Sequence, residues 1–212
     1  MDGVINVTHK KVGIMGGTFN PIHNGHLMLA DRAMEQFALD EIVFIPCGIP
    51  YMKEGQSVLP GQVRAEMTGL AIQNKHSYRL SNMEIERQGN TYTYETLERL
   101  KEEQPETDFY FILGADSLFN LDKWAKPERI FANCHILAAV RDDATIEQME
   151  EHVRMLQQRY GASIFLLRTG YLDISSSDIR RKVALGENIT EDVPEKVAEY
   201  IKMHHLYQNS NV

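Results

Sequence analysis

Residues 16–26 combine glycine, proline and histidine in a spacing that suits the binding of a phosphate chain. The stretch reads Gly16-Gly17-Thr18-Phe19-Asn20-Pro21-Ile22-His23-Asn24-Gly25-His26. It follows the apolar run Val12–Met15 and leads into a segment of helical period from about Leu27, which predicts strand, glycine turn and helix start. Glycine lets the backbone approach a ligand closely, and the amide groups of a helix start favour an anion. His23 and His26 lie three residues apart and would share one helix face.

Two ordinary interpretations of the histidine pair stay open at this point. His23 and His26 could simply cap a helix, which is the better interpretation of a bare His-x-x-His pair. They could also bind a metal, although no third ligand stands at a characteristic spacing. The dinucleotide pattern G-x-G-x-x-G and the phosphate-loop pattern ending in Gly-Lys-Ser/Thr are both absent. The segment alone therefore does not identify its ligand.

A second polar segment, near the C-terminus, carries hydroxyl groups and an arginine at the start of another predicted helix. It reads Ile174-Ser175-Ser176-Ser177-Asp178-Ile179-Arg180. Ser175 and Asp178 are close to a capping box, which is ordinary helix-start chemistry. Taken together, however, Gly17–His26 and Ile174–Arg180 resemble the two signatures of the nucleotidyltransferase superfamily that also includes the class I aminoacyl-tRNA synthetases. The signatures are Gly-x-Phe-x-Pro-x-His-x-Gly-His and Ile-Ser-Ser-Ser/Thr-x-x-Arg, and they occur in the right order.

This resemblance implies direct, in-line transfer of a nucleotidyl group, in which the protein positions the substrates and neutralises phosphate charge. His23, His26 and Arg180 would be the catalytic residues, the histidines as hydrogen-bond donors and the arginine as a fixed charge. The ATP-binding residues would be Gly16, Gly17, Thr18, Phe19, Gly25, Ile174, Ser175, Ser176 and Ser177. Mg²⁺ is expected to arrive with ATP and to need few protein ligands, so no residue is assigned to it.

The middle of the chain resembles the bacterial nicotinate-mononucleotide adenylyltransferases. The matching segments are Thr91–Leu97, with the pattern Thr-Tyr-Thr-x-x-Thr-Leu, Gly114–Trp124, with Gly-x-Asp…Trp, and Ala139–Arg141, at a Val-x-Arg turn. The likeness runs from Lys11 to about Leu206. It implies that the AMP part of ATP is joined to nicotinate mononucleotide, which gives deamido-NAD and pyrophosphate in NAD biosynthesis.

The same resemblance implies roles for residues that would bind the mononucleotide. Trp124 would stack on the cationic pyridine ring, and Thr91 and Thr93 would lie near the ring carboxylate and the phosphate. Asp116 would contact a ribose, and Arg141 would approach the nicotinate. Each role has an ordinary alternative: a packing residue for Trp124, a helix N-cap for Asp116 and a solvated loop residue for Arg141.

Lys53 would bind the mononucleotide phosphate by the same resemblance. The family often has Pro-Pro-His-Lys after the second strand, whereas this chain has Pro50-Tyr51-Met52-Lys53. The lysine matches and the two residues before it depart from the pattern. A flexible surface lysine beside Glu54 is the alternative.

Bulk properties exclude several classes of protein. The chain has 212 residues, of which 22 are basic and 30 acidic, for a net charge of −8. An acidic chain is not a general binder of nucleic acid or of anionic membranes. The two cysteines, Cys47 and Cys134, stand alone, which favours a reducing cytoplasm. No apolar run approaches the length of a membrane span, and the first eleven residues carry no apolar signal core.

Alternating apolar runs and amphipathic segments must position these residues. Strands are predicted at 12–15, 42–46, 109–113, 135–140 and 164–167, and weaker extended segments at 78–80 and 83–86. Helices are predicted at 26–37, 63–72, 94–100, 146–156, from 175 and at 194–201, and a loop at 48–61. This pattern predicts an α/β, Rossmann-like, doubly wound parallel sheet whose ligand lies beyond the carboxyl ends of the strands. We expect a single nucleotidyltransferase domain over 1–212, with a small C-terminal helical subdomain over about 173–212.

Other functions remain open from the sequence. Another adenylyltransferase of the superfamily would take nicotinamide mononucleotide or phosphopantetheine as acceptor, although the latter enzyme would be shorter and lack the Trp124 segment. A nucleotide-binding regulator without turnover is a further alternative, which loss of His26 or Arg180 would have favoured. The family is often dimeric, so a homodimer is possible.

Overall fold

A six-stranded parallel sheet forms the centre of the molecule. The computed structural model describes residues 9–48, 58–140, 146–170 and 173–208. The strands are β1 (Lys10–Gly17), β2 (Glu41–Pro46), β3 (Tyr78–Leu80), β4 (Thr107–Leu113), β5 (His135–Val140) and β6 (Ile164–Arg168). Their order is β3-β2-β1-β4-β5-β6, and every neighbouring pair is parallel. The strand order therefore reverses between β1 and β4, which is where such sheets bind ligands, and the predicted Rossmann-like fold is confirmed.

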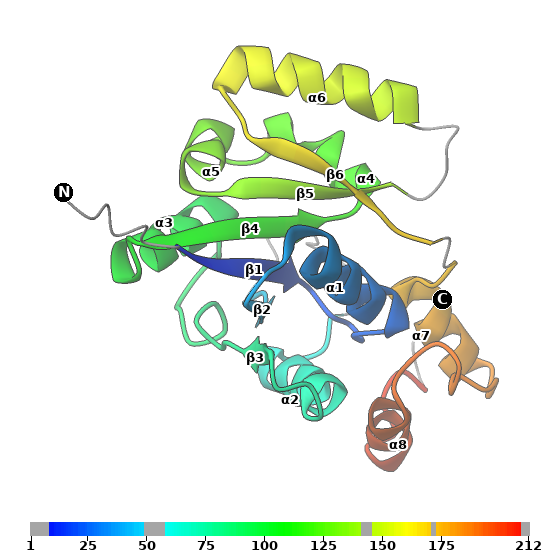
Figure 1. The fold of residues 1–212 in the computed structure, drawn as a ribbon. Helices are drawn as coiled ribbons and strands as arrows, with labels where there is room; N and C mark the ends of the chain where they lie inside the picture. Colours follow the sequence, from blue (N-terminus) through cyan, green and yellow to red (C-terminus); the bar gives the residue numbers. More distant parts are fainter. Residues whose placement is uncertain (1–8, 49–57, 141–145, 171–172, 209–212) are drawn as a thin grey trace.

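Helices cover both faces of the sheet (Figure 1). They are α1 (Asn24–Phe37), α2 (Gly61–Ile72), α3 (Thr93–Glu103), α4 (Ala115–Leu118), α5 (Pro127–Asn133), α6 (Ile146–Tyr160), α7 (Ser176–Ala184) and α8 (Glu195–Met203), with a short 3₁₀ helix, η2 (Leu121–Lys123). Among the described residues, no helix is both long and apolar enough to cross a membrane.

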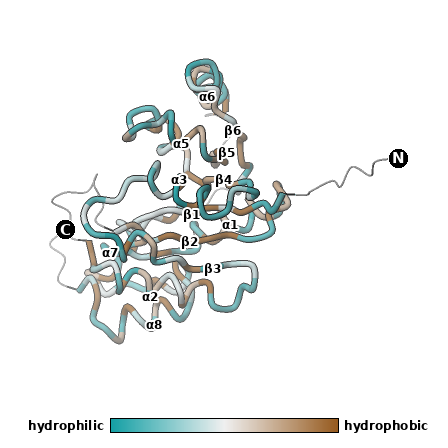
Figure 2. Tube along the Cα trace, turned by 90° about the vertical axis from the view of Figure 1, so that its left-hand side faces the viewer, coloured by the Kyte–Doolittle hydropathy of each residue, from teal (hydrophilic) through white to brown (hydrophobic). Residues whose placement is uncertain are grey.

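Two hydrophobic clusters, one on each face, hold the helices to the sheet. Successive strand side chains point to opposite faces, so Ile14 belongs to the cluster under α3, α5 and α6, whereas Met15 belongs to the cluster under α1, α2, α7 and α8. The strands are apolar on both faces for this reason, and they form the hydrophobic interior seen in Figure 2. Burial of each large aliphatic side chain contributes about 1.5–3 kcal/mol.

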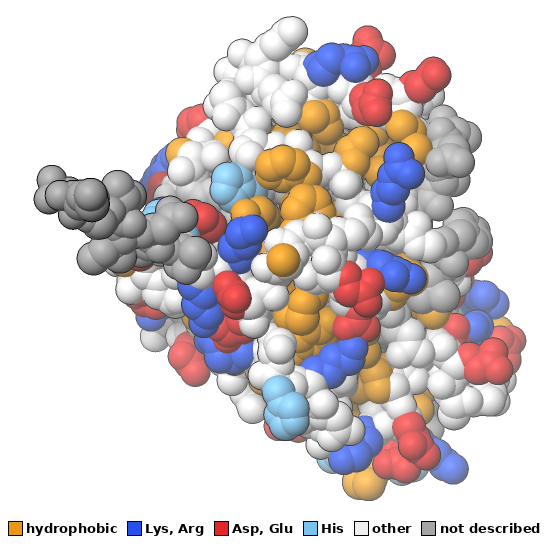
Figure 3. Space-filling model, viewed as in Figure 1, with side chains coloured by type: hydrophobic (Ala, Val, Ile, Leu, Met, Phe, Trp, Pro, Cys, Tyr) orange, Lys and Arg blue, Asp and Glu red, His pale blue; other side chains and the backbone are white. Residues whose placement is uncertain are grey.

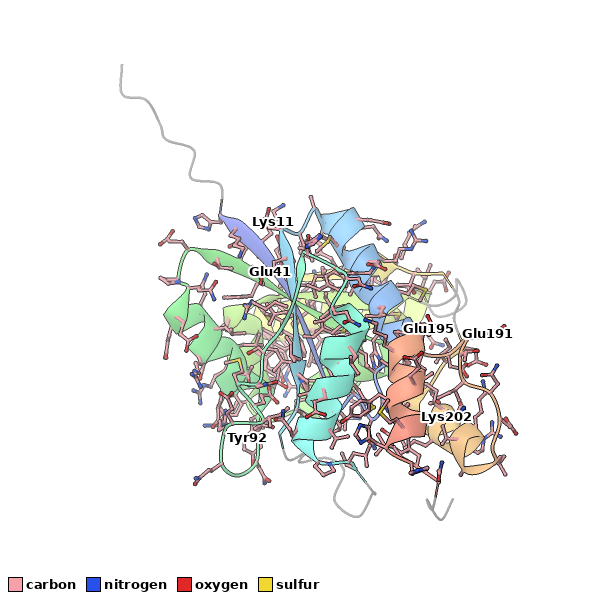
Figure 4. All side chains as sticks on the ribbon, turned by 90° about the horizontal axis from the view of Figure 1, so that it is seen from below. Lys11, Glu41, Tyr92, Glu191, Glu195 and Lys202 are labelled. Carbon is pink, nitrogen blue, oxygen red and sulfur yellow. The ribbon has the colours of Figure 1, made fainter. Side chains whose placement is uncertain are left out.

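The C-terminal helices pack back onto the first half of the chain. The amide of Asn24 donates to the carbonyl of Asp192 over 2.8 Å, and the hydroxyl of Tyr207 donates to Oδ1 of Asn20 over 2.9 Å. Tyr200 of α8 donates to Glu66 of α2, and the two helices lie side by side in Figures 1 and 4. These contacts bring the start of α7 to the carboxyl end of β1.

Two sequence predictions about elements need correction. Residues 83–86 form part of a turn rather than a strand, because Glu84 is held by Thr96 of α3 instead of by a neighbouring strand. The short helices α4 and α5 were not predicted, although Pro127 at the first position of α5 is a known helix-start signal. Most of the predicted loop 48–61 lies outside the described residues.

Candidate active site

Two adjoining cavities lie beyond the carboxyl ends of the central strands. The first has a volume of about 350 Å³ and the second of about 370 Å³. Both are lined by Gly16, Thr18, Phe111, Ser117 and Trp124. Figure 4 separates the two ends of the sheet: Lys11 and Glu41 lie where β1 and β2 begin, and Tyr92, which lines the first cavity, lies toward the opposite end. Molecules bound in the two cavities would meet over the end of β1.

The turn after β1 has no room for side chains at its glycines. A Cβ atom on Gly17 would lie 2.9 Å from the ring of Phe19, and one on Gly16 would lie 3.2 Å from the ring of Phe111. Phe19 itself is buried with a φ of 48°, which is rare for a bulky residue. The Asn20–Pro21 peptide is cis. The turn therefore presents backbone to the cavities at Gly16 and Gly17, beside Thr18.

The two histidines are stacked at the start of α1. His23 is the N-cap residue, and its ring centroid lies 3.7 Å from that of His26. The amide of His23 donates to Nδ1 of His26 over 3.2 Å, so His26 carries its ring hydrogen on Nε2 when neutral. Both residues line the second cavity. The shared helix face and the capping interpretation are both confirmed, and capping through Nδ1 leaves Nε2 of His26 a hydrogen-bond donor.

Ser175 begins α7 in the way that the sequence predicted. Its Oγ accepts a hydrogen bond from the amide of Asp178 over 3.1 Å and donates to Oδ2 of the same residue over 2.6 Å. This hydrogen bond stabilises the ionised carboxylate and holds the pKa of Asp178 below its ordinary value. The capping prediction is therefore confirmed, and the amide-rich start of α7 faces the second cavity together with residues 174–177.

The neighbouring residues of α7 tie this helix to the turn after β1. Ser176 donates through Oγ to the carbonyl of Pro21 over 2.9 Å. Arg180 donates through Nη1 to the carbonyl of Asn20 over 2.9 Å and through Nη2 to Oγ of Ser177 over 3.2 Å. The two sequence motifs thus form one wall of the second cavity. Since no carboxylate lines this cavity in the described part of the chain, its charged and polar groups suit an anion.

Trp124, Thr91 and Thr93 all line the first cavity. The Trp124 ring meets Phe111 edge-on, with 6.2 Å between ring centroids, and its side chain is half-buried. The Thr91 hydroxyl oxygen is buried and makes no well-formed hydrogen bond within the described residues, although it lies close enough to Glu84 to lower the pKa of that carboxyl. The first cavity therefore offers an aromatic face beside hydroxyl groups.

Of the remaining predicted residues, only Asp116 lies in the described part of the chain. Asp116 is exposed in the first turn of α4 and lines neither cavity. The N-cap of α4 is Gly114, so the N-cap interpretation of Asp116 is wrong, and its ribose contact stays a prediction. Lys53 and Arg141 lie outside the described residues.

Sequence reasoning missed a fully buried arginine beside the site. The Arg64 guanidinium donates to the carbonyls of Thr18 (2.6 Å), Cys47 (2.7 Å), Gly48 (2.9 Å) and Leu59 (2.9 Å). It thereby joins the turn after β1 to the end of β2 and to the start of α2. The only available signal was a charged residue among the apolar residues of α2. Reasoning also missed Glu84, Thr96 and Lys123, which line the first cavity.

His23 and His26 are not part of a set of metal ligands in the described part of the chain. Within the described ranges, no group of three or more His, Cys, Asp or Glu side chains could hold a metal ion. The metal-binding interpretation of His23 and His26 therefore finds no third ligand there. The two rings face a cavity with a guanidinium and hydroxyl groups instead.

Comparisons with known proteins agree on one family. The cytidylyltransferase-like family model matches residues 14–182. A protein of Lachnoclostridium phytofermentans is 45% identical over 93% of this chain and 99% of its own length, and one of Geobacter metallireducens is 38% identical over 93% and 98%. Both are described as probable nicotinate-nucleotide adenylyltransferases.

Solved structures share the fold. The nicotinic acid mononucleotide adenylyltransferase of Plasmodium falciparum, complexed with NaAD, superimposes with a TM-score of 0.78 at 24% identity, over 95% of this chain and 99% of that one. A nicotinate-nucleotide adenylyltransferase structure from Vibrio parahaemolyticus gives a TM-score of 0.67 at 20% identity, over 95% and 97%. At these identities the likeness supports the fold alone.

Proposed function

This chain belongs to the cytidylyltransferase-like family and, within it, to the nicotinate-nucleotide adenylyltransferases, and we propose that its two cavities hold ATP and nicotinate mononucleotide. The reaction joins the AMP part of ATP to the phosphate of the mononucleotide and releases pyrophosphate. The observation that carries the proposal is the wall shared by the cavities at Gly16 and Thr18. A phosphate from each cavity can approach the other there, because Gly16 places no side chain between them.

The second cavity takes the triphosphate. Nε2 of His26 donates to an oxygen of the α-phosphate, where charge builds as the new bond forms, and His23 supports it from the adjacent ring. The start of α7 and Arg180 hold the β and γ phosphates that leave as pyrophosphate. Direct attack by the acceptor phosphate needs no covalent intermediate on the enzyme.

The first cavity takes the mononucleotide. The flat face of Trp124 stacks on the pyridinium ring, since a cation gains from an aromatic face. Thr91 and Thr93 supply hydroxyl groups toward the ring carboxylate and the phosphate. Lys53 and Arg141 remain proposed ligands on the basis of the motif match alone. A homodimer likewise remains a proposal from the family resemblance.

Mg²⁺ enters with ATP as part of the substrate. Its preferred ligands are oxygens and water, and the second cavity supplies no carboxylate from the described residues. We therefore assign it no protein ligand.

A pyrophosphate-release assay with ATP and Mg²⁺ tests the proposal. It should compare nicotinate mononucleotide, nicotinamide mononucleotide and phosphopantetheine as acceptors. We expect the highest kcat/KM with nicotinate mononucleotide. Preference for either other acceptor would replace the proposed substrate, and inactivity with all three would favour a nucleotide-binding regulator.

A further inference from the structure

A carboxylate stands in the wall of the first cavity. Glu84 belongs to the turn between β3 and α3 and lines the cavity together with Thr91 and Thr96. Thr96 of α3 donates through Oγ1 to Oε1 of Glu84 over 2.7 Å. The Thr91 hydroxyl and the Gly48 amide also lie against this carboxylate. One side chain thus joins the end of β2, the segment before α3, and α3 itself.

The Gly48 peptide is held tightly between Glu84 and Arg64. A Cβ atom on Gly48 would lie 2.4 Å from the backbone oxygen of Glu84 and 3.0 Å from Cγ2 of Thr91. On the other side, the Gly48 carbonyl accepts a hydrogen bond from Nη2 of Arg64 over 2.9 Å. The Glu84 carboxylate and the Arg64 guanidinium therefore fix one peptide from both sides, and this peptide abuts Thr91.

The carboxyl group of Glu84 should contribute less to the stability of the fold at neutral pH than at low pH. Burial raises its pKa above the ordinary value. The hydrogen bond from Thr96, the nearby Thr91 hydroxyl and Gly48 amide, and the charge of Arg87 offset this only in part. Arg87 is itself paired with Glu95. The Cys47 thiol also faces the carboxylate. A group whose pKa is raised in the folded protein stabilises the fold at a pH below its ordinary pKa. This contribution is lost as the pH rises through the raised pKa.

We propose that Glu84 is a positioning residue for the mononucleotide. Its carboxylate positions the Thr91 hydroxyl, which lines the first cavity, and holds the Gly48 peptide behind it. Thr96 fixes the carboxylate in turn from α3. This inference rests on the proposed function of the first cavity. Glu84 should therefore affect binding of the acceptor in the first cavity and leave binding of ATP in the second cavity unchanged.

The variant Glu84→Gln tests this role with little change of shape. Its amide nitrogen cannot accept the hydrogen bonds that a carboxylate oxygen accepts. We expect KM for nicotinate mononucleotide to rise about tenfold, and kcat and KM for ATP to stay within about twofold. The melting temperature at pH 7.5 should be unchanged or higher. Glu86→Gln is the matched control, because Glu86 is exposed in the same turn and lines neither cavity.

Fluorescence supplies a readout that does not depend on turnover. The chain has one tryptophan, Trp124, and it lines the first cavity. Titration with nicotinate mononucleotide should give a Kd about tenfold weaker in Glu84→Gln than in the wild type. Thr96→Val keeps the side-chain volume and removes the donor to Glu84, so it should weaken the same Kd in the same direction by a smaller factor.

The outcomes that would overturn the inference are distinct. Unchanged mononucleotide binding in Glu84→Gln would overturn it, and so would a fall in melting temperature accompanied by equal losses for both substrates. A wild-type protein that neither binds nor uses nicotinate mononucleotide would overturn the proposed function and this inference together. Wild-type binding beside an unaffected Glu84→Gln variant would overturn this inference alone.

Discussion

The residues of the second cavity each serve the fold as well as the proposed chemistry. Ser175 caps α7, Arg180 holds the carbonyl of Asn20, and His26 accepts from the amide of His23. Residue types and spacing predicted the capping roles of Ser175 and His26, because each motif carries them on a short, local segment. The contact between Arg180 and Asn20 joins distant segments and was not predicted. Glu84 could not be predicted in this way, since its partners come from distant segments and its own segment has no clear periodicity.

The most sensitive residue of the proposed chemistry is His26. We expect His26→Ala to lower kcat by about 10²–10³, the scale for loss of one donor to transition-state charge, while ATP binding remains measurable. Steady-state kinetics and an ATP titration would measure both. Unchanged turnover in this variant would rule out the catalytic role of His26.

The stacking role of Trp124 predicts a different kinetic signature. We expect Trp124→Ala chiefly to raise KM for the mononucleotide, by about tenfold, because stacking on a cation is lost where water is partly excluded. Initial rates at varied concentrations of each substrate would separate the two KM values. A change in KM for ATP alone would show that the assignment is wrong.

At the scale of elements, α2 shows where sequence pattern and structure diverge. The apolar residues of this helix do pack against the core, namely Val63, Met67, Leu70 and Ala71. The buried residues also include the polar Arg64 and Thr68. The sequence predicted the helix, but it did not predict the burial of these two polar side chains. Four backbone carbonyls around the site attract the guanidinium inward, and single-residue hydrophobicity does not record such partners.

Arg64 should therefore contribute strongly to stability. We expect Arg64→Met to lower the free energy of unfolding by about 3–5 kcal/mol, because it leaves several buried carbonyls without their donor. Urea unfolding would measure the change. Arg79→Met serves as a control, since Arg79 is half-exposed in its ion pair with Glu41 and should contribute about 1 kcal/mol or less. Equal losses in the two variants would contradict the special role of Arg64.

The whole molecule brings together segments that are distant in the chain. Alternating strands and helices predicted the parallel sheet, and the position of the ligand beyond the strand ends followed from it. The contact of α7 with the end of β1 depends instead on tertiary hydrogen bonds such as Tyr207 to Asn20, which no local pattern contains. Figure 3 shows basic and acidic side chains interspersed on the face that it draws, in keeping with an anion site confined to the cavities.

Buried proton donors predict how the stability of the whole molecule varies with pH. Burial raises the pKa of Cys134 to about 12, and the hydrogen bond to Glu66 raises that of Tyr200 to about 12. Burial also raises the pKa values of Tyr78 and Tyr207. Above the ordinary values of 9.0 and 10.0 the unfolded chain loses these protons while the folded protein keeps them. Stability should therefore fall as pH rises above 9.

Thermal unfolding between pH 7 and 11 would measure this effect. The Cys134→Ala variant has no thiol to titrate. The difference in melting temperature between this variant and the wild type should therefore change as pH rises past 9. A melting temperature that stays constant up to pH 11 would contradict the account of these buried groups.

The central claim is that ATP in the second cavity reacts directly with an acceptor in the first. The stereochemical course at the α-phosphorus tests it, with ATP that carries sulfur in place of one α-phosphate oxygen, as a single stereoisomer, and nicotinate mononucleotide as acceptor. A single in-line displacement across the wall at Gly16 and Thr18 predicts a product of inverted configuration. Retention of configuration would show two displacements through a covalent enzyme intermediate, and would contradict the arrangement proposed for the two cavities.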